Sequence, residues 1–198
     1  QFNLMFKTFQ GVTEDAKNGF QYGQLLGQAD AAMGLWQAIH AAWVHAGEQR
    51  SDFFIGGYLS ALFERDVAVW EQVIGELLDD PAVRPSVLGV VWRSGMTDSM
   101  ASKLLAMAAA GTLDPRTFRL FVYGGVINKM PLPVVSKAIE LMMGDGTDQL
   151  GSDAALDVIN SRMRGHADDR EALAELLERV LDSAAFIEGK AGAKANNM

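Results

Sequence analysis

Three histidines, His40, His45 and His166, have the widest chemical range of any side chains in this cysteine-free chain. A zinc site on one helix needs two histidines four residues apart, so that both face the same ion. His40 and His45 are five apart, which places them about 140° apart around a helix. His166 stands in a loop beside Asp168 and Asp169. This spacing favours no histidine metal site, and the neighbouring tryptophans predict a packing role for His40.

An acidic loop offers the oxygen ligands that Ca²⁺ prefers. It holds Asp145, Asp148 and Asp153 together with Gly146 and Gly151. An EF-hand needs carboxylates at positions one, three and five and a late glutamate, and this loop lacks that spacing. Helix capping and turn formation are the simpler explanation of these residues. We therefore expect them to be structural.

No segment carries a recognisable nucleotide-binding or nucleophile motif. The glycine pairs at 56–57 and 124–125 lack both the GxxxxGK[ST] pattern and a GxGxxG after a strand. Ser94 and Ser99 lack the GxSxG context of a nucleophile elbow. The sequence thus predicts no catalytic residue, no metal and no cofactor, and favours a protein that is not an enzyme. An active site assembled from distant positions is the alternative left open.

Tryptophan and methionine are enriched at interfaces, and the chain has four tryptophans and ten methionines. Core packing is the favoured interpretation for any single one of them. If the chain has a binding groove, we expect the aromatic residues of its first two helical hairpins to line it. This expected groove consists of Tyr22, Trp36, His40, Trp43 and Tyr58.

Helices are expected to position these side chains. Residues 67–79 place apolar residues at i, i+1, i+4, i+5, i+8 and i+9 from Val69, with acidic and amide residues on the other side. No stretch shows the sustained alternation of a strand. About ten helices joined by short loops, and hence an all-α fold, are predicted. They start near Thr13, Asp30, Ser51, Asp66, Asp80 or Ser86, Thr97, Asp114, Pro131, Ser152 and Asp168.

The chain also resembles itself at a spacing of 34 residues. That shift places Phe20 on Phe54 and Gly23 on Gly57, and twice the shift places the glycine pair 56–57 on 124–125. The pattern predicts helical hairpins repeated about five times. Over residues 13–187 it resembles the α-solenoid class of helical-hairpin repeats, HEAT-like or tetratricopeptide-like, and no named family within that class. A compact helical bundle is the alternative.

Glycines at 19, 23 and 27 repeat every four residues within the first expected helix. A glycine inside a helix costs up to about 1 kcal/mol relative to alanine. Close approach of a neighbouring backbone is the usual compensation, and we expect it here.

Composition narrows the class of protein. The formal net charge of −8 argues against a nucleic-acid-binding module and against attachment to anionic membranes. There is no apolar run long enough to cross a membrane, and the N-terminus does not resemble a signal peptide. The absence of cysteine fits a reducing compartment. We expect a cytoplasmic part of a larger protein, with an apolar lead-in at 1–12, one helical domain at 13–187 and a disordered tail at 188–198.

Two hypotheses follow. The first is a non-catalytic module that binds another protein or another domain of its parent chain, and a homo-oligomeric assembly element is compatible with it. An acidic module suits a partner with a basic patch or an amphipathic helix. The second is a helical-bundle enzyme or small-ligand sensor with an apolar pocket lined by tryptophan and methionine. A pocket of several hundred Å³ with His40 or a buried carboxylate in its wall would favour the second.

Overall fold

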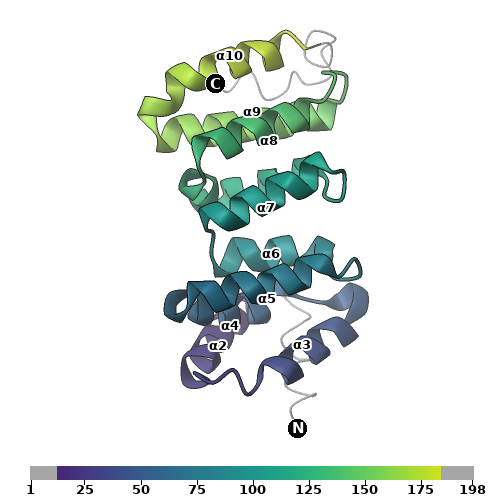
Figure 1. Ribbon diagram of the computed structural model, residues 1–198, viewed down its shortest axis with the longest axis vertical. Helices are drawn as coiled ribbons and strands as arrows, with labels where there is room; N and C mark the ends of the chain where they lie inside the picture. The colour runs from purple at the N-terminus through teal and green to yellow at the C-terminus, as the bar shows by residue number, and fades with distance from the viewer. Residues whose placement is uncertain (1–12, 184–198) are drawn as a thin grey trace. The chain divides into compact units, whose positions relative to one another are not determined.

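The computed structural model describes residues 13–183 and, for residues 13–17, only the backbone (Figure 1). Every element in residues 13–183 is a helix, which confirms the predicted all-α fold. None of these helices has the length and apolar character needed to cross a membrane. The predicted lead-in at 1–12 and tail at 188–198 lie outside the described residues.

The contacts of the chain divide it into two compact units, Gln1–Gly95 and Met96–Met198. The sequence predicts a single domain over 13–187, and we describe each unit by itself. The first unit contains α2 (Thr13–Ala29), α3 (Trp36–His45), η1 (Gly47–Gln49), α4 (Asp52–Arg65), α5 (Val67–Asp79) and α6 (Arg84–Ser94). The second contains α7 (Asp98–Ala109), η2 (Pro115–Lys129), α8 (Leu132–Met143), α9 (Gln149–Gly165), η3 (Ala167–Asp169) and α10 (Arg170–Leu181).

Side-chain caps explain why several helices begin where the sequence predicts. The Ser51 hydroxyl, the Asp66 carboxylate and the Thr97 hydroxyl each accept a hydrogen bond from a backbone N–H of the first turn. Such caps satisfy donors that have no partner inside the helix. These three positions therefore start α4, α5 and α7 as expected.

The second helix starts later than predicted. Asp30 is expected to cap it directly, but α3 begins at Trp36. The Asp30 carboxylate instead accepts hydrogen bonds from the backbone N–H groups of Gly34 and Leu35, at 2.9 and 2.8 Å. Met33 in the intervening turn has a positive φ of 55°. The carboxylate thus stabilises a turn in front of the helix.

The predicted cap at Ser152 is wrong. Helix α9 begins at Gln149, and Asp148 caps it by accepting a hydrogen bond from the Leu150 N–H at 3.0 Å. Ser152 lies inside the helix and is fully buried. The aspartate reaches the first turn one turn earlier than the serine would, so the helix starts there.

The two glycine pairs that the sequence places in register differ in structure. Residues 56–57 lie within the regular helix α4. Gly124 and Gly125 instead have positive φ values of 70° and 69°, and they kink η2. Glycine adopts this conformation without the steric cost that a side chain adds. The same dipeptide therefore permits helix packing in one unit and a sharp bend in the other.

Helices α2 and α4 pack side by side with their backbones in close contact. A Cβ atom on Gly23 would overlap the carbonyl oxygen of Phe54, and one on Gly57 would overlap that of Phe20. One on Gly27 would lie 2.6 Å from the carbonyl oxygen of Tyr58. The contacts advance in the same direction along both helices, so the helices run parallel. The two contacts are reciprocal: Gly23 meets Phe54 and Gly57 meets Phe20, and the two glycines, like the two phenylalanines, are 34 residues apart in sequence.

Helices α4 and α6 are joined by a half-buried arginine. Arg93 forms an ion pair with Asp52 at 2.8 Å, and its guanidinium lies 3.8 Å from the ring centre of Phe53 and 4.2 Å from that of Trp92. Burial raises the pKa of Asp52, and the positive charge of Arg93 opposes that rise. A Cβ on Gly89 would collide with the Asp52 carboxylate, so this glycine makes room for the ion pair.

In the second unit a buried arginine links α9 to η2. The Arg162 side chain is 6% exposed and donates to the carbonyl oxygens of Ile127 and Met130, at 3.0 and 2.9 Å. It also pairs with Asp169 at 2.5 Å. Carbonyl groups at the end of a helix lack the partners that an inner turn provides, and Arg162 donates to two of them. The Ile127 carbonyl also accepts from the Met130 N–H at 3.3 Å. One side chain thus holds three segments together.

Candidate functional site: a pocket between α3 and α5

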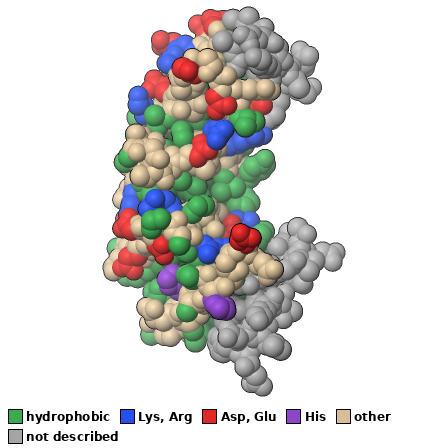
Figure 2. Space-filling model, turned by 90° about the vertical axis from the view of Figure 1, so that its right-hand side faces the viewer, with side chains coloured by type: hydrophobic (Ala, Val, Ile, Leu, Met, Phe, Trp, Pro, Cys, Tyr) green, Lys and Arg blue, Asp and Glu red, His purple; other side chains and the backbone are tan. Residues whose placement is uncertain are grey.

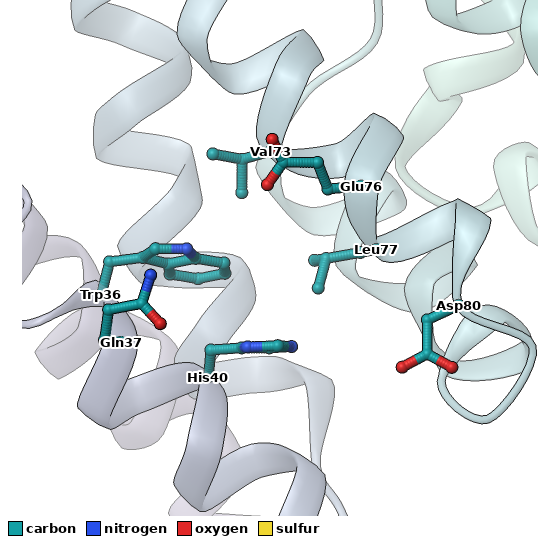
Figure 3. Close-up of a pocket in the computed structure, with 7 residues that line it drawn as sticks. All are labelled: Trp36, Gln37, His40, Val73, Glu76, Leu77 and Asp80. Atoms are coloured by element: carbon teal, nitrogen blue, oxygen red, sulfur yellow. The ribbon is translucent and has the colours of Figure 1, made fainter.

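A pocket of about 290 Å³ lies between α3 and α5 of the first unit (Figure 3). Its lining comes from one side of each helix. Helix α3 contributes residues at i, i+1 and i+4, and α5 with the residue that follows it contributes residues at i, i+3, i+4 and i+7, which are the spacings of a single helix face. The lining residues are Trp36, Gln37, His40, Val73, Glu76, Leu77 and Asp80.

The α3 wall of the pocket is aromatic. The rings of Trp36 and His40 are stacked, with centroids 5.5 Å apart and planes 17° apart. Trp36 also stacks with Tyr58 of α4, at 6.2 Å and 13°. Figure 3 shows the Trp36 and His40 rings on the α3 side, with Leu77 opposite them on α5. The pocket therefore has aromatic rings on its α3 side and an aliphatic side chain on its α5 side.

Tyr58 holds this aromatic wall in place from behind. It is 1% exposed, and its hydroxyl donates a hydrogen bond to the Asp30 carboxylate at 2.7 Å. Asp30 also accepts the two backbone N–H groups that shape the turn before α3. These three hydrogen bonds, that from Tyr58 foremost, lower the pKa of Asp30 below its ordinary value. The carboxylate connects α4 to the start of α3.

Replacing Asp30 by asparagine should reveal this connection as a pH dependence. A carboxyl whose pKa is lowered on folding stabilises the fold fully above its ordinary pKa of about 3.9, and that contribution is lost as the pH falls through the lower folded value. At pH 7 we expect the D30N chain to be less stable by about 1 kcal/mol. Urea denaturation at pH 7 and near pH 2.5 should show the difference shrinking at acid pH. A difference independent of pH would contradict the assignment.

Two carboxylates flank the α5 wall. Glu76 and Asp80 are exposed, and each uses one oxygen within its own segment. Glu76 Oε1 accepts from the Gln72 side chain at 3.0 Å, and Asp80 Oδ1 accepts from the Ala82 N–H at 2.9 Å. Among residues 18–183, neither carboxylate has an ion-pair partner. One oxygen of each therefore remains available to a ligand.

The imidazole of His40 adds a further polar atom. Its Nε2 is buried and has no hydrogen-bond partner in the described part of the chain. A buried polar atom without a partner costs free energy unless a ligand or water satisfies it. In Figure 3 the His40 ring extends from α3 toward α5, across the pocket. The ring thus lies in the pocket wall, with this nitrogen covered by surrounding atoms.

Aromatic rings and negative charge together characterise this pocket. The wall is aromatic, the edge carries two negative charges, and the lining contains no lysine or arginine. An aromatic face and nearby carboxylates both attract a cation. No group of three or more histidine, aspartate or glutamate residues among those described could hold a metal ion. The arrangement can bind a positively charged group without a metal.

The structure brings together part of the predicted groove. Trp36 and His40 line the pocket, and Tyr58 stacks behind Trp36. Trp43 is 3% exposed and lies against the guanidinium of Arg50, whose centre is 5.3 Å from its ring. Tyr22 contacts the Phe54 ring, with centroids 6.0 Å apart. Trp43 and Tyr22 are therefore packing residues outside the pocket lining.

The acidic side of the pocket was not anticipated from the sequence. Glu76 and Asp80 are four residues apart and border the apolar positions 73 and 77 of the amphipathic segment 67–79. A pair of carboxylates bordering an apolar stripe is the signal that could have suggested them. It is a weak signal, because most exposed helix faces carry such residues.

The other residues considered for chemistry have structural roles. The Asp145 carboxylate accepts two hydrogen bonds from Thr147, which lower its pKa, and Asp148 caps α9. His166 Nε2 lies 2.8 Å from the carbonyl oxygen of Asn128. His45 is exposed at the last residue of α3 and does not line the pocket.

Comparison of the chain with known proteins identifies no related protein. No protein-family model matches the chain, and no significant match is found among curated proteins or among solved structures. The functional proposal therefore depends on the pocket itself.

Proposed function

We propose that the chain is a non-catalytic protein-binding module built from helical-hairpin repeats of the α-solenoid class. The reciprocal packing of α2 and α4 supports the repeat: Gly23 contacts Phe54 and Gly57 contacts Phe20, and a shift of 34 residues exchanges the members of these two contacts. Stacked hairpins present consecutive helices along one surface, and such surfaces suit the binding of extended partners. The inference from repeat to binding is by analogy with that class.

The pocket between α3 and α5 is the observation that carries the proposal. It opens between the second helices of two consecutive hairpins, and its stacked Trp36 and His40 offer an anchor site of the kind that aromatic residues provide at interfaces. Figure 2 shows acidic, basic and hydrophobic side chains mixed over the face in view. General surface charge therefore does not single out an interface on that face. The partner is another protein or another domain of the parent chain.

Selection of binding peptides tests this function directly. Random dodecapeptides displayed on phage would be selected against the full chain, and enriched sequences would be synthesised and measured by calorimetry. We expect dissociation constants of about 1–100 µM, typical of a single groove with few anchors. The Gln37→Trp variant places a large side chain at the pocket from an exposed position, and should weaken binding at least about tenfold, or 1.4 kcal/mol.

The matched control is Ala38→Trp, which adds the same side chain on the opposite, exposed side of α3. Its binding should equal that of the unchanged chain. A selection that enriches no peptide would argue against a protein-binding function. Peptides that bind the unchanged chain, the Gln37→Trp variant and the Ala38→Trp variant equally would show that the binding site lies outside this pocket.

A second candidate, a small-ligand sensor, draws on the same pocket because His40 stands in its wall. The volume of about 290 Å³ is at the lower limit for small-molecule sites, and the two carboxylates at the edge are exposed. The small volume and the exposed edge both favour the end of a partner's side chain, rather than an enclosed metabolite, as the ligand of this pocket. A metabolite that raises the melting temperature of the unchanged chain, but not of the Gln37→Trp variant, would favour the sensor.

A further inference from the structure

We infer that the pocket between α3 and α5 recognises a guanidinium group, the end of an arginine side chain in a basic segment of the partner. This inference rests on the proposed protein-binding function and specifies its partner. The seven lining residues carry two negative charges, Glu76 and Asp80, and no lysine or arginine. The whole chain has a formal charge of −8, so a basic partner is also attracted at longer range.

The aromatic wall favours a flat cation. A guanidinium group is planar and weakly hydrated, and it stacks on aromatic rings, whereas the ammonium group of lysine is compact and strongly hydrated. A cation within about 6 Å of a tryptophan ring is attracted by its negative face. Trp36 is held nearly parallel to both His40 and Tyr58, at 17° and 13°, so its orientation is set before any ligand binds.

The carboxylates provide acceptors for the donors of the guanidinium. The guanidinium group of arginine carries five N–H donors that point outward within one plane, and carboxylate oxygens are their preferred acceptors. Glu76 and Asp80 stand one helical turn apart, and hydrogen bonds from Gln72 and Ala82 restrain one oxygen of each. His40 Nε2, buried beside these carboxylates in the pocket wall, lacks a partner among the described residues.

A guanidinium held between aromatic rings and a carboxylate already exists inside this protein. Arg93 places its guanidinium 3.8 Å from the centre of the Phe53 ring and 4.2 Å from that of Trp92, while pairing with the Asp52 carboxylate at 2.8 Å. The internal site is closed by its own arginine. The α3–α5 pocket has the aromatic wall and the carboxylates without a resident arginine.

Two arginines lie near the end of α5 but are engaged elsewhere. Arg84 donates to the carbonyl oxygen of Leu78 at 2.7 Å, and Arg50 donates to that of Ala82 at 2.9 Å. Neither lines the pocket. They satisfy carbonyl groups at and beyond the helix end, and leave the outward carboxylate oxygens of Glu76 and Asp80 for a ligand.

Titration with capped amino acids tests the inference on the full chain. N-acetyl-arginine methylamide would be added to the ¹⁵N-labelled chain and followed by the indole N–H signal of Trp36 and the amide signals of α3 and α5. We expect saturation with a dissociation constant of about 1–10 mM, as suits a ligand of this size. The citrulline analogue, which has the same shape without the charge, should bind at least tenfold more weakly. The lysine analogue should bind several-fold more weakly.

Charge removal at the pocket supplies the matched variants. The double variant Glu76→Gln, Asp80→Asn should weaken arginine binding at least tenfold, while the asparagine retains an oxygen for the Ala82 N–H. Glu175→Gln with Glu178→Gln makes the same change in net charge at exposed positions of α10 and should leave binding unchanged. Circular dichroism would confirm that both variants fold.

The two proposals fail in different ways. Equal binding of the arginine, lysine and citrulline analogues, or equal binding by both double variants, would overturn the guanidinium inference. Selected peptides that need the open pocket but contain no arginine would also overturn it, and would leave the protein-binding function intact. Absence of any pocket-dependent peptide would count against the function itself.

Discussion

Replacing Gly57 by alanine will lower the free energy of unfolding of the first unit by about 3 kcal/mol. The added methyl group would overlap the carbonyl oxygen of Phe20 and lie 3.0 Å from the backbone nitrogen of Gln24. Backbone atoms cannot rotate away as a flexible side chain can, so α2 and α4 must separate. Helix propensity alone predicts the opposite sign, because alanine is favoured over glycine by about 1 kcal/mol inside a helix.

Tryptophan fluorescence isolates this effect, because all four tryptophans lie in the first unit. Urea denaturation followed at that signal gives the stability of the region around α2 and α4. The control is Gly34→Ala, at which the nearest atom to a new Cβ, an Asp30 carboxylate oxygen, is an ordinary 3.6 Å away. We expect it to change stability by less than about 0.5 kcal/mol. A Gly57→Ala chain as stable as the unchanged protein would contradict the close packing of the two helices.

Replacing Arg162 by methionine will destabilise the second unit by roughly 3–5 kcal/mol, the usual cost of removing one partner from a buried ion pair. Methionine retains much of the length of the side chain but none of its donors. The Met130 carbonyl loses its hydrogen bond from Arg162, and the Ile127 carbonyl keeps only the 3.3 Å bond from the Met130 N–H. Asp169, whose side chain is 15% exposed, keeps an uncompensated charge. Hydrogen exchange of the η2 and α9 amides, measured by mass spectrometry, would report the loss locally.

Arg164→Met is the control for this substitution. Arg164 is exposed on the last turn of the same helix, and its replacement should cost less than about 0.5 kcal/mol. Adding Asp169→Asn to Arg162→Met should recover part of the lost stability, since it removes the unpaired charge. If Arg162→Met and Arg164→Met are equally mild, Arg162 does not link η2 to α9.

Local signals predicted most helix starts, and the two exceptions at Asp30 and Ser152 have different causes. Ser51, Asp66 and Thr97 cap helices because their side chains reach N–H groups of the next turn, an interaction that the sequence contains entirely. The Asp30 carboxylate does not cap α3 directly: it accepts from the Gly34 and Leu35 N–H groups of the preceding turn, and also from Tyr58, 28 positions away. No local pattern predicts a partner at that distance. Propensity and capping rules are overridden where tertiary hydrogen bonds intervene.

The glycines also show that residue identity alone does not determine local structure. Close backbone approach was expected for Gly23 and Gly27, and the structure places both against α4. The pair Gly124 and Gly125 resembles the pair at 56–57 in sequence, yet it adopts a left-handed kink. Glycine is compatible with both states, so its identity alone cannot choose between close packing and a turn.

Half of the candidate site was within reach of the sequence. Trp36 and His40 lie four residues apart on one helix, so their stacking follows from helical spacing. From the sequence, Glu76 was predicted to be a solvent-facing residue of another helix, and Asp80 to start the helix after it. Only the packing of α3 beside α5 brings the two pairs to one pocket, and that arrangement is tertiary. This explains why the aromatic wall was predicted and the acidic edge was not.

The central claim is that partners dock in the pocket between α3 and α5, and one measurement tests it most directly. The ¹⁵N-labelled full chain would be titrated with a peptide selected for binding, and perturbed amide signals would be mapped on the structure. We predict that the largest changes fall on α3, on α5 and on the indole N–H of Trp36. Changes confined to the second unit, with the Trp36 signal unmoved at saturation, would contradict the claim.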